Sequence, residues 1–139
     1  MGPVSVVFNL RGEVVSVVLG RRVSSPCVDG SVMDLLRLYL AGVPVGMDGV
    51  PVRLDVSPFV RRVLEEVRRI PWGEVLTYGE LARRIGVRSA RAVGMALGKN
   101  SVPIIVPCHR VVAKRGLGGF SSGLDWKRFL LKLEGHEAY

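Results

Sequence analysis

The alternation of apolar and polar positions predicts a strand-rich beginning and a helix-rich remainder. Residues 4–10 and 14–19 alternate in the manner of strands, and the Arg-Gly-Glu between them predicts the turn of a hairpin. Residues 21–30 show no regular spacing and are expected to be irregular. Apolar residues at helical spacing predict a helix over residues 32–41, capped by Asp29 or Ser31 and ended by Gly42. One more strand is expected within residues 50–54.

Helical spacing dominates after Val56. Ser57 and Pro58 are typical of a helix cap and first turn, and the helix they start is expected to end before Pro71. A last helix is expected over residues 124–133, with Gly135 as its C-terminal stop. These patterns predict an α/β protein of the α+β type, with a small N-terminal sheet-and-helix lobe over residues 1–56 and a mainly helical domain over residues 57–139.

Two short helices in the second part have the spacing of a helix-turn-helix. Thr77 and Glu80 form a capping box for a helix over residues 78–85, and Ser89 caps a second helix over residues 90–98. Such a pair is also found as a plain αα-hairpin. Small residues along the second helix would let its backbone approach a groove closely, and Arg91 lies in its first turn, where a recognition helix carries base-reading side chains. These features favour DNA binding.

The charge distribution favours a polyanionic partner. Residues 1–56 carry five basic and five acidic side chains, so the formal net charge of +8 lies entirely in residues 57–139. A basic proteome or arginine-rich codon usage would give the same excess. Glutamine is absent and asparagine occurs only at Asn9 and Asn100, which fits a thermophile, although GC-rich coding has the same effect.

The sequence shows neither a membrane-spanning run nor a signal-peptide pattern. We therefore expect a cytoplasmic protein without a membrane partner, associated with the nucleoid if the source is a prokaryote. Cys27 and Cys108 are expected to be free thiols. The chain lacks a cluster with metal-ligand spacing, so no metal site is expected.

The strongest candidate for chemistry lies in residues 104–112. The β-branched run Ile104-Ile105-Val106 predicts a strand that leads into Pro107, after which a cysteine and a histidine follow side by side. A thiol attacks carbon only as the thiolate, and a neighbouring histidine favours that form. Glu134, at the end of the last helix, is the best acidic candidate to orient this histidine. The alternative is that Cys108 is a small buried apolar residue and His109 a satisfied core histidine.

Together, these motifs resemble the O6-alkylguanine-DNA alkyltransferases, also called methylated-DNA–protein-cysteine methyltransferases. The resemblance rests on Pro107-Cys108-His109-Arg110-Val111, on residues 70–82, on residues 90–94, on Asn100, and on residues 127–135, in the family's order. It covers residues 57–136 and implies a winged-helix-like domain that carries the helix-turn-helix.

The resemblance implies a role for each matched residue. Cys108 would accept the alkyl group, while His109, through a water, and Glu134 would deprotonate it. Asn100 would brace the turn before the cysteine, Tyr78 would hydrogen-bond the guanine, and Arg91 would fill the gap left by a flipped nucleotide. The further implied residues are Ser89, Ala90, Ala92 and Gly94 for DNA contact, and Val106, Pro107, Ser121, Ser122 and Lys127 for the substrate pocket.

The implied function is direct DNA repair. An alkyl group would pass from O6 of guanine, and by the same resemblance from O4 of thymine, to Cys108 after the nucleotide is flipped out of double-stranded DNA. The protein would act as a monomer in the minor groove, without a cofactor, and only once, since water has no easy route to cleave a thioether. Two other classes stay open: a lesion-binding or regulatory module without chemistry, and a cysteine hydrolase with repeated turnover.

Overall fold

The computed structural model describes residues 1–25 and 27–139; residue 26, within the stretch expected to be irregular, lies outside the described residues. The elements follow in the order β1 (Val4–Phe8), β2 (Val14–Leu19), α1 (Gly30–Leu40), α2 (Pro58–Val67), β3 (Leu76–Thr77), α3 (Tyr78–Ile85), α4 (Ala90–Leu97), the 3-10 turn η1 (Cys108–Arg110), β4 (Val111–Val112) and α5 (Leu124–Leu133). The predicted mixed α/β class is confirmed. None of the described helices has both the length and the apolar character needed to cross a membrane.

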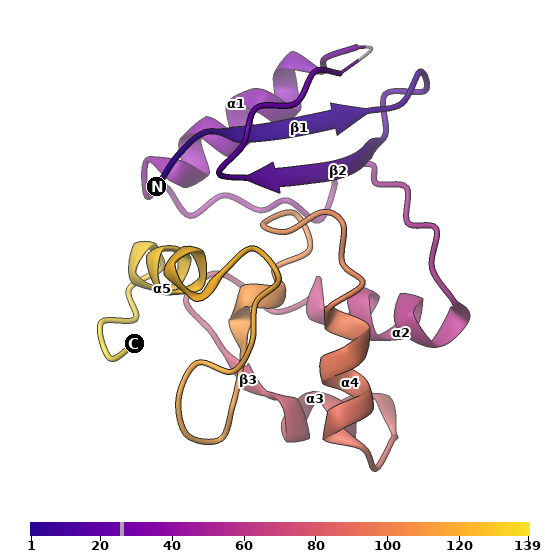
Figure 1. Cartoon of the computed structure of the whole chain (residues 1–139), viewed down its shortest axis with the longest axis vertical. Helices are drawn as coiled ribbons and strands as arrows, with labels where there is room; N and C mark the ends of the chain where they lie inside the picture. Colours follow the sequence, from indigo (N-terminus) through magenta and orange to yellow (C-terminus); the bar gives the residue numbers. More distant parts are fainter. Residues whose placement is uncertain (26) are drawn as a thin grey trace.

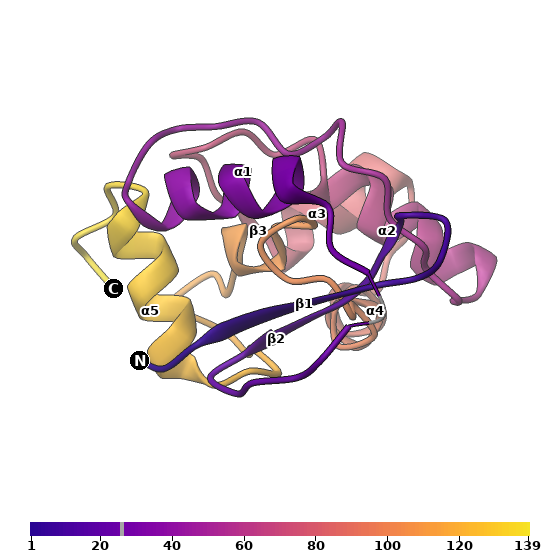
Figure 2. The same cartoon turned by 90° about the horizontal axis from the view of Figure 1, so that it is seen from above.

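The N-terminal segment forms a hairpin with one helix beside it (Figures 1 and 2). β1 pairs antiparallel with β2, with Val4 opposite Leu19. The strand ends at Phe8, two residues earlier than predicted, because the Asn9 side chain accepts hydrogen bonds from the N–H groups of Arg11 and Glu13 and so starts the turn. The strand expected within residues 50–54 is reduced to a single bridge between Val52 and Val14.

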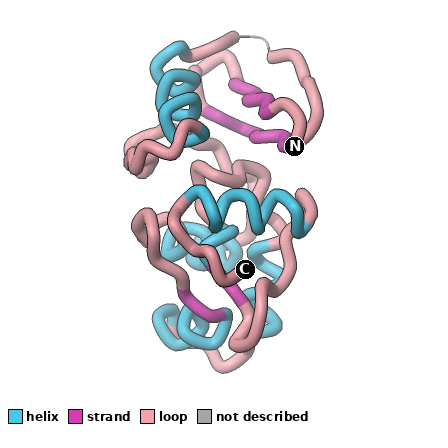
Figure 3. The backbone as a smooth tube through the Cα atoms, turned by 90° about the vertical axis from the view of Figure 1, so that its left-hand side faces the viewer, coloured by secondary structure: helices cyan, strands magenta, loops and turns pink. Residues whose placement is uncertain are grey.

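The second part is built around α2, α3 and α4, and it lies below the hairpin (Figure 3). Thr77 and Glu80 form the predicted capping box at the start of α3, which ends at Gly86 in the left-handed conformation, with φ of 77°. Ser89 caps α4 by accepting a hydrogen bond from the N–H of Ala92. β3 and β4 form a short parallel ladder that ties the start of α3 to the segment after Cys108. The predicted pair of helices and its turn are therefore confirmed.

The strand predicted for Ile104-Ile105-Val106 is wrong. These residues form a compact turn, in which Ile104 has a φ of 73° and the N–H of Val106 donates to the carbonyl of Val102. All three are at most 2% exposed, so the apolar run reflects burial in the core rather than a place in a sheet. A β-branched residue with positive φ is strained, and the surrounding packing must offset that cost.

Hydrogen bonds attach the N-terminal segment to the part that carries the turn. The N–H of Val17 in β2 donates to the carbonyl of Ser101 at 2.9 Å. The guanidinium of Arg68, just after α2, donates to the carbonyl groups of Met47, at 2.9 Å, and Val50. The buried apolar residues of both parts form one continuous core. The hairpin and α1 therefore rest directly on the segments that position Cys108.

Candidate functional site

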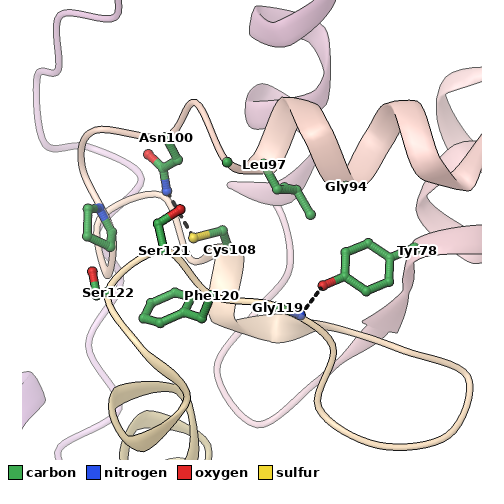
Figure 4. Close-up of a pocket in the computed structure, with 11 residues that line it drawn as sticks. Tyr78, Gly94, Leu97, Asn100, Cys108, Gly119, Phe120, Ser121 and Ser122 are labelled. Carbon is green, nitrogen blue, oxygen red and sulfur yellow. Dashed lines mark hydrogen bonds between the residues drawn. The ribbon is translucent and has the colours of Figure 1, made fainter.

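A cavity of about 310 Å³ opens beside Cys108, at the lower end of the range of about 300–1,000 Å³ that is typical of small-molecule sites. Helix α4, the turn after it, η1 and the glycine-rich β4–α5 loop form its walls (Figure 4). The lining residues are Tyr78, Gly94, Leu97, Gly98, Asn100, Pro103, Cys108, Gly119, Phe120, Ser121 and Ser122. The predicted residues Tyr78, Gly94, Asn100, Cys108, Ser121 and Ser122 are thus brought together around one space.

Asn100 holds the thiol of Cys108 at the cavity wall. Its Nδ2 donates to Sγ at 3.2 Å and to the carbonyl of Val106 at 2.9 Å, while its Oδ1 accepts from the N–H of Val102 at 3.0 Å. Burial raises the pKa of the Cys108 thiol, although the Asn100 hydrogen bond and the charge of Lys127 act in the opposite direction. The resting group is therefore the thiol, which needs a base before it can attack.

His109 and Glu134 form a buried pair next to this thiol. His109 is fully buried, and its Nε2 lies 2.6 Å from Oε2 of Glu134. Burial lowers the pKa of His109, so the ring is neutral at rest, and contact with a carboxylate assigns the proton to Nε2. Nδ1 is buried and makes no hydrogen bond to the described residues. The histidine therefore has the tautomer of a base that accepts a proton at Nδ1.

Glu134 is held ionised by donors from several elements. Burial by itself would raise the pKa of its carboxyl, but the hydrogen bond and charge of His109, followed by the hydrogen bonds of Arg110 and Tyr39, lower it to about 2. Arg110 donates from Nε to Oε1 at 2.8 Å and from Nη2 to Oε2 at 3.1 Å. Its Nη1 donates to the carbonyl of Ile70. This carboxylate can stabilise a positive charge that forms on His109.

Tyr39 and Arg110 are site residues to which the sequence analysis gave no role. The Tyr39 hydroxyl, on α1, donates to Oε2 of Glu134. In the sequence, Tyr39 is one of the residues at helical spacing in the helix predicted over residues 32–41. A hydroxyl on a face that is otherwise apolar was the available signal, because a buried tyrosine needs a hydrogen-bond partner.

Tyr78 and Lys127 fix the glycine-rich loop over the cavity. The Tyr78 hydroxyl accepts a hydrogen bond from the N–H of Gly119 at 3.0 Å (Figure 4). Lys127 is fully buried, and its Nζ donates to the carbonyl groups of Val111, at 2.7 Å, and Gly119, at 2.9 Å. Burial lowers the pKa of Lys127 to about 8. The ammonium group therefore lies behind the loop and acts as its anchor.

Three residues predicted for the pocket lie outside its lining. Val106 is buried and contributes its carbonyl to Asn100. Pro107 lines a separate groove between the N-terminal segment and the end of α2. Lys127 acts on the site through its charge and through its hydrogen bond to the carbonyl of Gly119, and its Nζ lies 5.8 Å from the centroid of the Tyr78 ring. These residues shape the wall and the loop rather than the open space.

The predicted DNA-contacting residues lie along α4. Ala90 and Arg91 are exposed in its first turn, next to the capping Ser89, while Ala92 is partly exposed. Gly94 lies where the helix passes Tyr78, and a Cβ there would be 3.8 Å from the tyrosine ring. Where α4 borders the cavity, Gly94 leaves space beside the Tyr78 ring, while Leu97 lines the cavity and Met95 is exposed to solvent.

Comparisons with known proteins point to one family. A family model described as "6-O-methylguanine DNA methyltransferase, DNA binding domain" matches residues 58–136. A methylated-DNA–protein-cysteine methyltransferase of Methanopyrus kandleri is 57% identical over 100 residues, which make up 72% of this chain and 76% of the relative.

Two solved structures are informative. The chain resembles Mycobacterium tuberculosis OGT in complex with DNA, with a TM-score of 0.74 and 35% identity over 87% of this chain and 80% of that one. It also resembles S. pombe Atl1 in complex with damaged DNA containing O6-carboxymethylguanine, with a TM-score of 0.53 and 38% identity over 63% of this chain and 83% of that one.

Proposed function

Since the chain belongs to the O6-methylguanine-DNA methyltransferase family, we propose that it repairs double-stranded DNA by moving an alkyl group from O6 of guanine to Cys108. The observation that carries this proposal is the placement of a thiol and a buried His–Glu pair at a cavity beside the recognition helix. A base in a duplex cannot reach this thiol, so the damaged nucleotide must be flipped out of the stack.

The proposed reaction is a displacement at carbon. A water carries the proton of Cys108 to Nδ1 of His109, and Glu134 stabilises the imidazolium that forms. The sulfur then forms a bond to the alkyl carbon as the bond from that carbon to O6 breaks and its electron pair goes to the guanine. The product is a thioether, and nothing in the cycle restores the thiol, so each chain acts once.

Tyr78 is proposed to stabilise the departing guanine. Its oxygen accepts from Gly119, and its O–H makes no hydrogen bond to the described residues, so this proton is available to a base in the cavity. Donation to the guanine as negative charge develops on it lowers the barrier of the displacement. Ser121 and Ser122, on the same wall, are proposed to contact the O6 side of the base.

The placement of Tyr78 can be tested at Gly118. A Cβ at this position would lie 2.5 Å from the Tyr78 hydroxyl, and φ is +74°. We expect Gly118→Ala to displace the tyrosine and to slow alkyl transfer by roughly tenfold or more, as misplacement of a catalytic group does. Gly116→Ala is the matched control, because φ there is +104° but no atom of the described residues lies within 4 Å of the added Cβ.

Both variants should lose about 1–3 kcal/mol of stability from the unfavourable φ. Only Gly118→Ala should lose rate in a single-turnover assay with alkylated duplex. Equal rates for the two variants would contradict the role of Tyr78.

We further propose that α4 enters the minor groove of the DNA. The small residues Ala90, Ala92 and Gly94 allow close approach of the helix, and Arg91 fills the space of the flipped nucleotide. The excess of positive charge in residues 57–139 supports this orientation. The same proposal places DNA binding and chemistry in residues 57–139 and a supporting lobe in residues 1–56, with the protein acting as a monomer.

Arg91→Ala tests this docking. We expect repair of a duplex to slow by roughly tenfold or more, because the flipped state loses the group that fills its gap. The reaction with free O6-benzylguanine, which needs no flipping, should change less than about twofold. Arg37→Ala removes the same charge from an exposed ion pair with Asp34 on α1 and should affect neither reaction. Equal losses on both substrates would overturn the role of Arg91.

The whole proposal is tested by incubating the protein with duplex DNA that carries O6-methylguanine labelled in the methyl group. We expect one label per chain, mapped to Cys108 by mass spectrometry of the digested protein. DNA with labelled O4-methylthymine, run in parallel, defines the substrate range. Absence of label with retained lesion binding would overturn the proposal in favour of a recognition module. Release of many product molecules per chain would do so in favour of a hydrolase.

A further inference from the structure

Helix α1 of the N-terminal segment places a hydroxyl group on the carboxylate of the proposed relay. Tyr39 is 1% exposed, its O–H donates to Oε2 of Glu134, and its oxygen lies 3.2 Å from Nε2 of His109. Its ring meets Trp72 edge to face, with the centroids 5.2 Å apart. The side chain is therefore held at both ends and cannot turn away from Glu134 without disturbing the core.

Two donors compete for the same oxygen of Glu134. Oε2 accepts from Tyr39 and also lies 2.6 Å from Nε2 of His109. Because both hydrogen bonds end on the same oxygen, each one weakens the interaction of Oε2 with the other donor. The hydroxyl of Tyr39 thus limits how strongly Glu134 stabilises a proton that arrives on His109.

We propose that Tyr39 is a positioning residue that sets the basicity of His109 through Glu134, so that the N-terminal segment determines the pH range in which Cys108 is activated. This inference rests on the proposed function. It gives the contact between the N-terminal segment and the second part of the chain a role in the chemistry, in addition to its role in packing.

The charged groups around the pair define the expected direction. Burial is the largest cause of the lowered pKa of His109; the charge and hydrogen bond of Glu134 act to raise it, and Arg110 on η1 and Lys127 on α5 act to lower it. Removing the Tyr39 hydroxyl leaves Arg110 and Lys127 in place. Without the competing hydrogen bond, the negative charge on Glu134 stabilises a proton on His109 more strongly. The pKa of His109 then rises. Because the neutral ring is the base, the acid limb of the rate profile moves to higher pH.

The test is Tyr39→Phe, which keeps the ring against Trp72 and removes only the hydroxyl. Single-turnover alkylation by free O6-benzylguanine is measured from pH 5 to pH 9, which leaves DNA binding out of the comparison. We expect the acid limb to shift to higher pH by roughly half a unit or more, the effect of one hydrogen bond on a coupled base. Leu36→Val, a packing change at a buried position of α1, is the control and should lower stability without moving the limb.

The outcomes separate this inference from the proposed function. If the wild-type protein does not react with free O6-benzylguanine, the same profiles are measured on alkylated duplex DNA, and a protein unreactive on both substrates would overturn the proposed function itself. A reactive wild-type protein with an unmoved limb in Tyr39→Phe, or with an equal shift in Leu36→Val, would overturn the role of Tyr39. If Tyr39→Phe does not fold, NMR of the wild-type protein decides. The Tyr39 hydroxyl proton should exchange slowly and show a cross-peak to the His109 ring, and its absence would overturn the inference.

Discussion

Replacing Glu134 by glutamine should lower the free energy of unfolding by about 3–5 kcal/mol, the cost of breaking a buried ion pair from one side. The Glu134 side chain is fully buried, and its carboxylate accepts hydrogen bonds from Arg110 and Tyr39 besides its contact with His109. The glutamine side chain is neutral, and its NH2 group would lie against a hydrogen-bond donor in the place of one of the two carboxylate oxygens. Arg110, itself 7% exposed, would then keep a positive charge without a counter-charge. Alkyl transfer should also slow by roughly a hundredfold or more, because the imidazolium loses its partner.

The loss of stability in Glu134→Gln should depend on pH, because the pKa of Glu134 differs between the folded and the unfolded protein. Its pKa is lowered from the ordinary glutamate value of 4.5 to about 2 in the folded protein. A carboxyl with a depressed pKa contributes stability that is complete above the unfolded pKa and is lost as pH falls through the folded pKa. At one pKa unit per 1.36 kcal/mol, this contribution is about 3 kcal/mol. It should disappear between about pH 4.5 and pH 2.

Urea unfolding of the wild type and Glu134→Gln at pH 7, 5, 4 and 3 measures this contribution. The stability difference between the two proteins should be constant from pH 7 to pH 5 and should shrink at lower pH. Glu65→Gln, at an exposed position of α2, removes the same charge and should show a small difference at every pH. A Glu134→Gln difference that is as large at pH 3 as at pH 7 would show that the carboxylate is not held ionised by its partners.

The elements that could be predicted from the sequence are those whose ends are marked by their own side chains. Helix α3 begins at the Thr77–Glu80 capping box and ends at Ile85, as predicted, because a cap is a contact between residues three apart. The same holds for α5, which is followed by Gly135 with a φ of +98°. Such signals depend on neighbouring residues alone, so no knowledge of the packing is needed to use them.

The errors occurred where tertiary packing decides the local structure. The run Ile104-Ile105-Val106 is as buried as a central strand, but Pro103 has no N–H to donate to a neighbouring strand, and the chain turns there instead. A run of β-branched residues indicates burial in a core, and a sheet is only one of the structures in which such residues are buried. The sequence alone does not distinguish a strand from a buried turn of this kind.

Only some residues of the candidate site could be predicted from the sequence, for the same reason. Cys108, His109 and Asn100 are close in the sequence, and Glu134 could be paired with them because it ends a helix that had been predicted. Tyr39 is 95 residues from Glu134, and its contact depends on how the N-terminal segment packs on the rest of the chain. No pattern within the first helix specifies that packing, so its hydroxyl could be flagged as unusual but not assigned a partner.

Cys108→Ala should abolish alkyl transfer completely while leaving lesion-selective DNA binding intact. The thiol supplies the only bond that forms to the alkyl group in the proposed reaction, and methyl in place of sulfur offers no nucleophile. Asn100 loses Sγ as an acceptor but keeps the carbonyl of Val106, so the turn should hold. The cavity gains space, which should leave the binding of a flipped base unchanged or slightly stronger.

The measurement combines labelled-methyl transfer with fluorescence anisotropy on matched duplexes with and without O6-methylguanine. Cys27→Ala is the matched control, because among the described residues its Sγ donates to the carbonyl of Asn9 and not to a group of the site, and this variant should transfer one label per chain. Cells sensitised to methylating agents should be protected by the wild type and by Cys27→Ala, but not by Cys108→Ala. Protection by Cys108→Ala would mean that recognition alone produces the biological effect. The protein would then bind the lesion in the cavity beside α4 and mark it for other proteins. The His109–Glu134 pair would have only a structural role.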